Sequence, residues 1–89
     1  MNKPVNLSSL ATKQYKKLEN KDQERIKKSL YKLSEDFTTG DIKKLRGINN
    51  KEALFRLRVG DFRVIFYPDK ESIKIIRIEK RSQDYNWLE

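Results

Sequence analysis

Residues 54–67 read LFRLRVGDFRVIFY, with apolar and polar side chains alternating along most of the stretch. Alternation with a period of two is typical of β-strands, and Gly60-Asp61 in the middle suits a two-residue type II′ hairpin turn. A turn of this length fixes which residues lie opposite each other in the hairpin. One face then holds only apolar pairs, which are Val59 with Phe62, Leu57 with Val64, and Phe55 with Phe66. We expect this face to pack against the rest of the protein.

The opposite face of the hairpin carries arginines in the same register. Arg58 is expected directly across from Arg63, with Arg56 further along the same strand. Like charges directly opposite each other destabilise a sheet, so this arrangement favours a bound anion. Since guanidinium groups bind phosphate in a planar, bidentate manner, we predict a phosphate site here. The alternative is that each arginine pairs with a carboxylate of the chain, the candidates being Asp61, Glu79 and Asp84.

Three strands are predicted in this half of the chain, over residues 53–59, 62–67 and 73–79. They are rich in β-branched and aromatic side chains, as strands usually are. If residues 68–72 form a five-residue loop, the third strand brings Arg77 beside Arg63. The residues that this register adds to the apolar face are Ile76, Ile78 and, near the sheet edge, Lys74.

The first half of the chain is predicted to be helical. Ser8 fits the N-cap of a helix over residues 9–18. Asn20 fits the N-cap of a second helix over residues 21–36, with Gln23 three residues later in capping-box spacing. Apolar residues recur along this second helix at helical spacing, which indicates one buried stripe. They are Ile26, Leu30, Leu33 and Phe37.

Together these elements predict an α+β fold in a single domain spanning residues 1–89. A short N-terminal strand over residues 5–7 and an antiparallel hairpin of the two helices would pack on an antiparallel β-meander. Residues 81–89 are expected to form a helical turn or a tail. The lysines dominate the outward faces of the helices, where they would form either a solvated surface or one that steers an anionic partner.

The composition excludes several kinds of chemistry. The 89 residues include 21 Lys and Arg against 13 Asp and Glu, for a formal net charge of +8, and they include neither Cys nor His. Without Cys there are no disulfides or thiolate nucleophiles, and without His there is no Ser-His-Asp triad and no imidazole ligand. Catalysis would therefore depend on Lys, Arg, Tyr or carboxylates. We expect no metal and no other cofactor.

The positive charge predicts a polyanionic partner, because a strongly basic small protein attracts anions. Nucleic acid is the first candidate, followed by an anionic membrane surface and an acidic protein. No apolar run approaches the length of a transmembrane helix, and the N-terminus at residues 1–4 lacks the apolar segment that a signal peptide would have. We therefore expect a cytoplasmic protein without a membrane association.

Two segments resemble a known family, the RelE/ParE toxin superfamily. Lys44-Leu45-Arg46-Gly47 followed by residues 54–66 is similar to its K-L-[KR]-G segment and its L-Y-R-[LI]-R-V-G-D-Y-R-V-I-Y hairpin. Residues 75–85, IIRIEKRSQDY, resemble the closing strand and tail of the family. The resemblance covers nearly the whole chain, is nearer to the RelE side than to the ParE side, and implies the RelE-like microbial RNase fold.

The resemblance also implies an activity and partners. RelE-like toxins cleave messenger RNA in the ribosomal A site, and an acidic antitoxin encoded beside them neutralises them. We therefore expect a ribosome-dependent endoribonuclease toxin, or mRNA interferase, that inhibits translation. One alternative is a ParE-like inhibitor of DNA gyrase without RNase activity. The other is a catalytically weakened, basic nucleic-acid-binding module.

The family's functional positions carry over unevenly to this sequence. Lys44 and Arg46 of the K-L-R-G segment are expected to bind RNA, since Arg46 matches a position that contacts RNA in the family. Arg56 falls on a catalytic Lys or Arg, and Arg63 matches the arginine that holds the scissile phosphate. Arg81 matches a basic position before the closing Tyr of the family, and Tyr85 matches that Tyr. The departures are Leu54 in place of a Lys, Lys80 where many relatives have His, and Glu79 in place of a common Gly.

Metal-independent cleavage of RNA needs a base for the 2′-OH proton, stabilisation of charge on phosphorus and an acid for the 5′-oxygen. Without His, the candidate bases are Lys80 and Arg56. Cations crowded around Lys80 would favour its neutral form; those expected are Arg63, Arg77 and Arg81. Arg58 would assist Arg63 in stabilising the developing charge. Tyr85 would stack on a base or orient the attacking hydroxyl.

Overall fold

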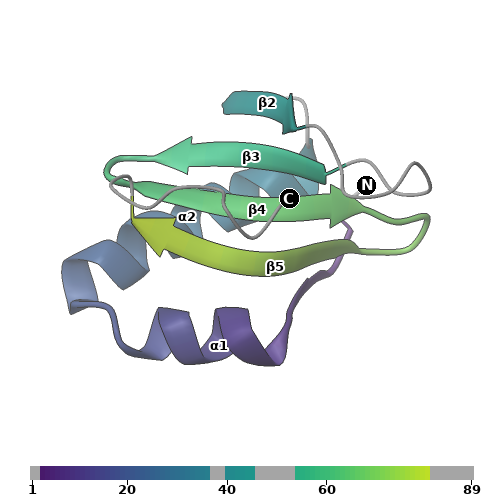
Figure 1. Ribbon diagram of the computed structural model, residues 1–89. Coiled ribbons are helices and arrows are strands. Elements are labelled where there is room, and N and C mark those ends of the chain that lie inside the picture. Colours follow the sequence, from purple (N-terminus) through teal and green to yellow (C-terminus); the bar gives the residue numbers. More distant parts are fainter. Residues whose placement is uncertain (1–2, 37–39, 46–53, 81–89) are drawn as a thin grey trace.

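The computed structural model describes residues 3–36, 40–45 and 54–80. Its elements are β1 (Val5–Leu7), α1 (Ser9–Lys16), α2 (Asn20–Glu35), β2 (Asp41–Leu45), β3 (Leu54–Val59), β4 (Phe62–Pro68) and β5 (Ile73–Lys80). Within these ranges the strands form one five-stranded sheet in the order β1-β5-β4-β3-β2 (Figure 1). The β1–β5 pair is parallel and the other pairs are antiparallel. The α+β class is confirmed, with a mixed sheet in place of a purely antiparallel one.

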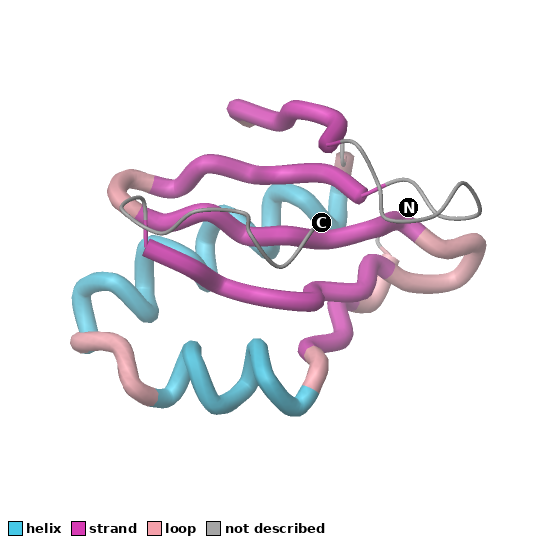
Figure 2. The backbone as a smooth tube through the Cα atoms, in the orientation of Figure 1, coloured by secondary structure: helices cyan, strands magenta, loops and turns pink. Residues whose placement is uncertain are grey.

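Both helices lie on one side of this sheet. In the tube view, α1 runs below β5 while α2 passes behind β4 and β3 (Figure 2). The core between them joins Ala11 of α1 and the α2 stripe to the apolar face of the strands. Ile26, Leu30 and Leu33 form that stripe and are buried as predicted, whereas Phe37 lies outside the described residues.

The β3–β4 hairpin has the register that its turn predicts. Val59 pairs with Phe62, Leu57 with Val64, and Phe55 with Phe66. Gly60 has a φ of 59°, the positive value that the first position of a type II′ turn requires. The two Phe rings stack at a centroid distance of 5.7 Å. The apolar face of this hairpin thus forms the floor of the core.

The register of β5 differs from the one predicted, because the loop before it is shorter and the strand contains a bulge. β4 extends through Pro68, which pairs with Ile73, and the ladder then shifts between Ile65 and Phe66. Phe66 lies opposite Ile75 and Ile65 lies opposite Arg77, so Ile76 is the extra residue. Without this bulge Arg77 would lie opposite Val64, in the core.

Three details of the predicted β5 register are therefore wrong. Ile76 does not join the apolar face, and Ile75 takes that place, while Ile78 lies on the apolar face as predicted. Lys74 pairs with Tyr67 on the opposite face. Arg77 lies on the predicted face but diagonally from Arg63, whose direct partner is Glu79.

The free edge of β5 is closed by β1 and by side chains of α1. β1 pairs only with the first part of β5, from Ile73 to Ile75. Beyond it, Ser8 Oγ donates to the Ile76 carbonyl at 2.7 Å, and Gln14 Oε1 accepts the Ile78 amide at 2.7 Å. Since unpaired strand edges promote aggregation, this cover protects the sheet at its β5 side.

The start of α2 differs from the predicted capping box. Asn20 is already inside the helix, and the N-cap is Glu19, whose side chain makes no capping hydrogen bond. Gln23 instead donates from Nε2 to the Tyr15 carbonyl at 3.0 Å, and Tyr15 Oη donates to the Gln23 carbonyl at 3.2 Å. This reciprocal pair connects the two helices at their joint.

One strand was not predicted, namely β2. It pairs antiparallel with β3, and three of its five side chains are exposed, those of Asp41, Lys43 and Lys44. The first two residues of the K-L-R-G segment therefore lie at the end of an edge strand. No helix in the described ranges is long and apolar enough to cross a membrane.

Replacing Ser8 by Ala should lower the free energy of unfolding by about 1–2 kcal/mol. The Ser8 hydroxyl accepts the Ala11 amide at 3.0 Å, as the predicted N-cap of α1, and also donates to the carbonyl of the bulged Ile76. Urea denaturation followed by far-ultraviolet circular dichroism measures the loss. The control is Ser9→Ala one residue later, for which we expect less than about 0.5 kcal/mol; equal losses would contradict the assigned role.

Candidate nucleic-acid interface

Four arginines of the described strands lie on one face of the sheet. β3 carries Arg56 and Arg58, β4 carries Arg63 and β5 carries Arg77, and their ladder positions place all of them on the side away from the core. We call the surface formed by Arg56, Arg58, Arg63 and Arg77 the arginine face. Arg58 lies directly opposite Arg63, as the turn predicts. The strand register thus brings together guanidinium groups from three strands.

The centre of the arginine face is buried. Ile65 lies between Arg56 of β3 and Arg77 of β5 and is 0% exposed, although it faces away from the helices. Arg56 itself is 9% exposed. Arg58, by contrast, has a side chain that is 48% exposed. The face therefore combines a deep guanidinium group with an accessible one.

Asp41 of β2 brings a carboxylate onto the arginine face. It lies opposite Arg58 in the ladder. Its Oδ1 is 3.6 Å from Arg56 Nη1, and its Oδ2 is 3.7 Å from Arg58 Nε. Both distances exceed hydrogen-bonding range, so the carboxylate is held by charge alone. Asp41 was missed because β2 was not predicted, and its sequence lacks the alternation that would have indicated a strand.

Glu79 of β5 is a second carboxylate on the arginine face, and it is buried. Glu79 Oε2 forms an ion pair with Arg77 Nε at 2.9 Å, and Glu79 lies directly opposite Arg63. Only 4% of its side chain is exposed. The alternative that the chain's own carboxylates pair with the arginines is therefore correct for Glu79 and Arg77. The carboxylate of Glu79 thus interrupts the row of positive charges that the sequence predicted.

Two lysines that were assigned to the site lie on the other side of the sheet. Lys44 is opposite Phe55 and Lys80 is opposite Phe62, which are positions on the helix-facing side. The expectation that the arginines surround Lys80 is therefore wrong for Arg63 and Arg77, which project from the opposite face. The physical reason is the alternation of side chains along β5, since Lys80 lies two residues after Ile78 and therefore shares its apolar face.

Two other lysines join the arginine face, which sequence reasoning had not assigned to it. Lys43 lies opposite Arg56 on β2, and Lys74 lies opposite Tyr67 on β5. Leu54, which replaces a basic residue of the related family, is buried at the end of this face. Basic side chains thus flank the arginine face on β2 and on β5, while the corner of the face at Leu54 is apolar.

The remaining predicted site residues lie outside the described part of the chain. They are Arg46, Arg81 and Tyr85. Their assigned roles stay predictions. Among the described residues, no three carboxylate, His or Cys side chains lie together as metal ligands would.

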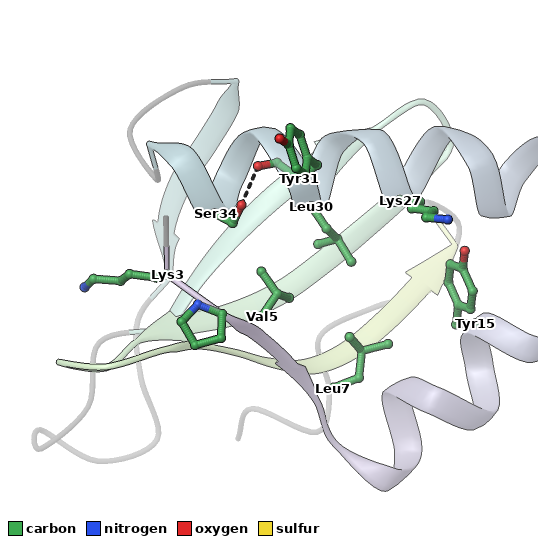
Figure 3. Close-up of a pocket in the computed structure, with 9 residues that line it drawn as sticks. Lys3, Val5, Leu7, Tyr15, Lys27, Leu30, Tyr31 and Ser34 are labelled. Atoms are coloured by element: carbon green, nitrogen blue, oxygen red, sulfur yellow. Dashed lines mark hydrogen bonds between the residues drawn. The ribbon is translucent and has the colours of Figure 1, made fainter. Parts of the chain in front are cut away.

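A separate groove of about 590 Å³ lies on the helical side, between β1, α1 and α2. Figure 3 shows Val5, Leu7 and Leu30 converging on its floor, with Tyr15 and Tyr31 at its sides. Tyr31 is 62% exposed, which is unusual for a large aromatic side chain. Lys3 and Lys27 also line the groove, so its apolar floor has basic surroundings. The groove lies across the sheet from the arginine face.

A family model described as "ParE toxin of type II toxin-antitoxin system, parDE" matches residues 5–85 of the chain. None of the curated proteins matches it in sequence. Among solved structures, the archaeal RelE–RelB complex from Pyrococcus horikoshii OT3 contains a similar chain, with 25% identity and a TM-score of 0.79. The match covers 94% of this chain and 100% of that one.

Two further solved structures share the fold. The YoeB dimer from Staphylococcus aureus has 20% identity and a TM-score of 0.72, and the match covers 89% of this chain and 97% of that one. The RelB–RelE antitoxin–toxin complex from Methanococcus jannaschii has 22% identity and a TM-score of 0.72, covering 96% and 100%. The RelE-like fold predicted from the sequence is confirmed.

Replacing Glu79 by Gln should lower the free energy of unfolding by about 2 kcal/mol. The amide keeps the shape of the side chain but removes the negative charge that Arg77 contacts at 2.9 Å. The expected loss is below the range for fully buried ion pairs because the Arg77 side chain is 26% exposed. Urea denaturation measures it. Glu71→Gln, in the exposed β4–β5 loop, removes the same charge as a control, and similar stabilities of the two variants would refute the assignment.

Proposed function

The chain belongs to the family of ParE toxins of type II toxin–antitoxin systems, within the RelE/ParE toxin superfamily, and from this membership we propose that it is a ribosome-dependent endoribonuclease. The observation that carries the proposal is the arginine face, where Arg56, Arg58, Arg63 and Arg77 come together. A face of this kind suits the phosphodiester backbone of messenger RNA. A ribosomal target would place the protein in the cytoplasm.

In the proposed reaction, the arginine face binds the scissile phosphate and stabilises its transition-state charge. Arg63 lies on the middle strand of the face, between Arg58 of β3 and Glu79 of β5. Donors fixed before the reaction stabilise developing negative charge more effectively than mobile ones. The contact of Glu79 with Arg77 and its place opposite Arg63 support such a fixed arrangement. We assign the scissile phosphate to Arg63 and Arg58. The buried Arg56 lies two residues before Arg58 on β3.

The proton transfers are assigned to residues after the end of β5 and to Arg56. Attack by the 2′-OH needs a proton acceptor, and departure of the 5′-oxygen needs a donor. Arg81 and Tyr85 are candidates because they follow β5 directly along the chain, and Arg56 is a further candidate. Lys80 is no longer one, because it projects from the helix-facing side of the sheet. Arginine and tyrosine are poor proton carriers as residue types. Positioning of the message by the ribosome would therefore supply much of the rate acceleration.

We further propose that an acidic antitoxin neutralises the protein. Two of the similar solved structures are complexes of a RelE toxin with RelB. Two surfaces of this chain suit an acidic, amphipathic partner: the arginine face, which carboxylates would neutralise, and the groove in Figure 3, whose floor would accept apolar side chains. Binding at the arginine face would block access of RNA.

Expression of the wild-type protein in bacteria should arrest translation and produce cuts in translated messages that follow the codon phase. Arg63→Ala should reduce cleavage by about 100-fold or more, because it removes a charge-stabilising donor. Primer extension on a translated reporter message measures the cuts. Lys16→Ala, which removes one positive charge from the exposed side of α1, is the control, and circular dichroism checks that both variants fold. Full cleavage by folded Arg63→Ala would refute the assigned site.

A second candidate function is inhibition of DNA gyrase, which the name of the matching family favours. It predicts stalled gyrase–DNA complexes in expressing cells and intact messages in the same primer-extension experiment. A third outcome, growth unaffected by expression, would indicate a catalytically weakened nucleic-acid-binding module. The buried Leu54 at a basic position of the family is the feature of this chain that such an outcome would implicate.

A further inference from the structure

The contact of Asp41 with Arg56 and Arg58 differs from the other ion pair of the arginine face. Glu79 is buried and lies 2.9 Å from Arg77. Asp41 has a side chain that is 55% exposed and stays 3.6 and 3.7 Å from its two guanidinium partners. Ion pairs with an exposed, loosely placed carboxylate contribute little to stability. Asp41 is therefore the weakly held carboxylate of the two.

Arg56 is left unsatisfied by this arrangement. Its side chain is only 10% exposed, and within the described part of the chain its Nη1 finds no hydrogen-bond acceptor. A buried donor without an acceptor destabilises the protein, and more so when it is charged. An oxygen of a bound anion that comes within about 2.9 Å of Nη1 would remove this destabilisation. Arg56 thus marks an incomplete anion subsite.

Arg58 supplies the accessible half of the same subsite. Its side chain is 48% exposed, and its Nε lies 3.7 Å from the Asp41 carboxylate, which is also 3.6 Å from Arg56 Nη1. The tetrahedral oxygens of a phosphate suit two guanidinium groups that lie on one strand face two residues apart. A carboxylate fixed to β2 reaches neither group at hydrogen-bonding distance, whereas a free phosphate is not restricted in this way.

We propose that Asp41 is a displaceable counter-ion, which occupies the anion subsite between Arg56 and Arg58 in the free protein and gives way to a backbone phosphate of RNA. The inference rests on the proposed function for the identity of the ligand, but it does not require cleavage. Asp41 opposes binding because the phosphate has to replace it. It therefore sets how tightly the arginine face holds RNA.

The test measures the affinity for a single-stranded 2′-O-methyl RNA of 12 nucleotides, which cannot be cleaved by 2′-OH attack. Fluorescence anisotropy of the labelled RNA gives the dissociation constant at fixed salt, since such affinities depend steeply on salt. Asp41→Asn should bind about 3- to 10-fold more tightly than wild type. The control is Asp69→Asn, in the exposed turn between β4 and β5, which changes the net charge equally and should alter affinity less than about twofold.

Two further measurements make the test specific to the subsite. The gain from Asp41→Asn should disappear when Arg56 and Arg58 are both replaced by Ala. In isotope-labelled wild-type protein, nuclear magnetic resonance should show the guanidinium signals of Arg56 and Arg58 and the carboxyl signal of Asp41 changing together on addition of the RNA. This second measurement needs no variant and covers the case in which the double replacement does not fold.

Equal affinities of Asp41→Asn and Asp69→Asn would overturn the inference, as would weaker binding by Asp41→Asn, which would make Asp41 a residue that orients the arginines. Absence of RNA binding by wild type and Asp41→Asn alike would overturn it too. A gain in affinity together with no cleavage of messages in cells would support the inference while refuting the proposed RNase activity. Failure of the counter-ion inference and failure of the proposed RNase activity are thus distinguishable.

Discussion

The two-residue turn at Gly60-Asp61 is the constraint on which the rest of the structure depends. Because side chains alternate between the faces of a strand, a shift of one residue in this hairpin would exchange its faces completely. The observed register sends Leu57 and Val64 into the core and Arg58 and Arg63 to the other side. The core and the arginine face are therefore two results of one backbone geometry.

The bulge at Ile76 extends this separation to β5. The strand contains two neighbouring apolar residues, Ile75 and Ile76, and then resumes alternation with Arg77, Ile78 and Glu79. In a regular ladder Ile75 and Ile78 would point to opposite faces of the sheet, so only one of them could reach the core. By taking Ile76 out of the pairing, the bulge keeps Ile75 and Ile78 in the core and directs Arg77 and Glu79 to the arginine face. Arg77 and Glu79, two residues apart on the strand, therefore share the arginine face and not the core.

How much the sequence predicts depends on how local each signal is. The approximate positions of the three predicted strands, the Ser8 cap, the burial of Ile26, Leu30 and Leu33, and the β3–β4 pairing rest on neighbouring residues, and the structure confirms them. The β5 register, the β2 strand and the contacts of Asp41 depend on partners distant in sequence, so no local pattern carries them. The grouping of Lys80 with the arginines was wrong for a local reason, because strand alternation places Lys80 on the same side as Ile78. Roles of Arg46, Arg81 and Tyr85 stay predictions.

The parallel pairing of β1 with β5 has a consequence for the kinetics of folding. Val5, near the start of the described chain, pairs with Ile73, near its end, so the sheet joins segments that are far apart in sequence. Contacts of such high sequence separation form late, because a long loop has to close before they can stabilise anything. The β3–β4 hairpin can form early, whereas β1 has no strand to pair with until β5 is in place. The free edge of β5 is thus open in any intermediate that precedes this step, and aggregation would compete with folding there.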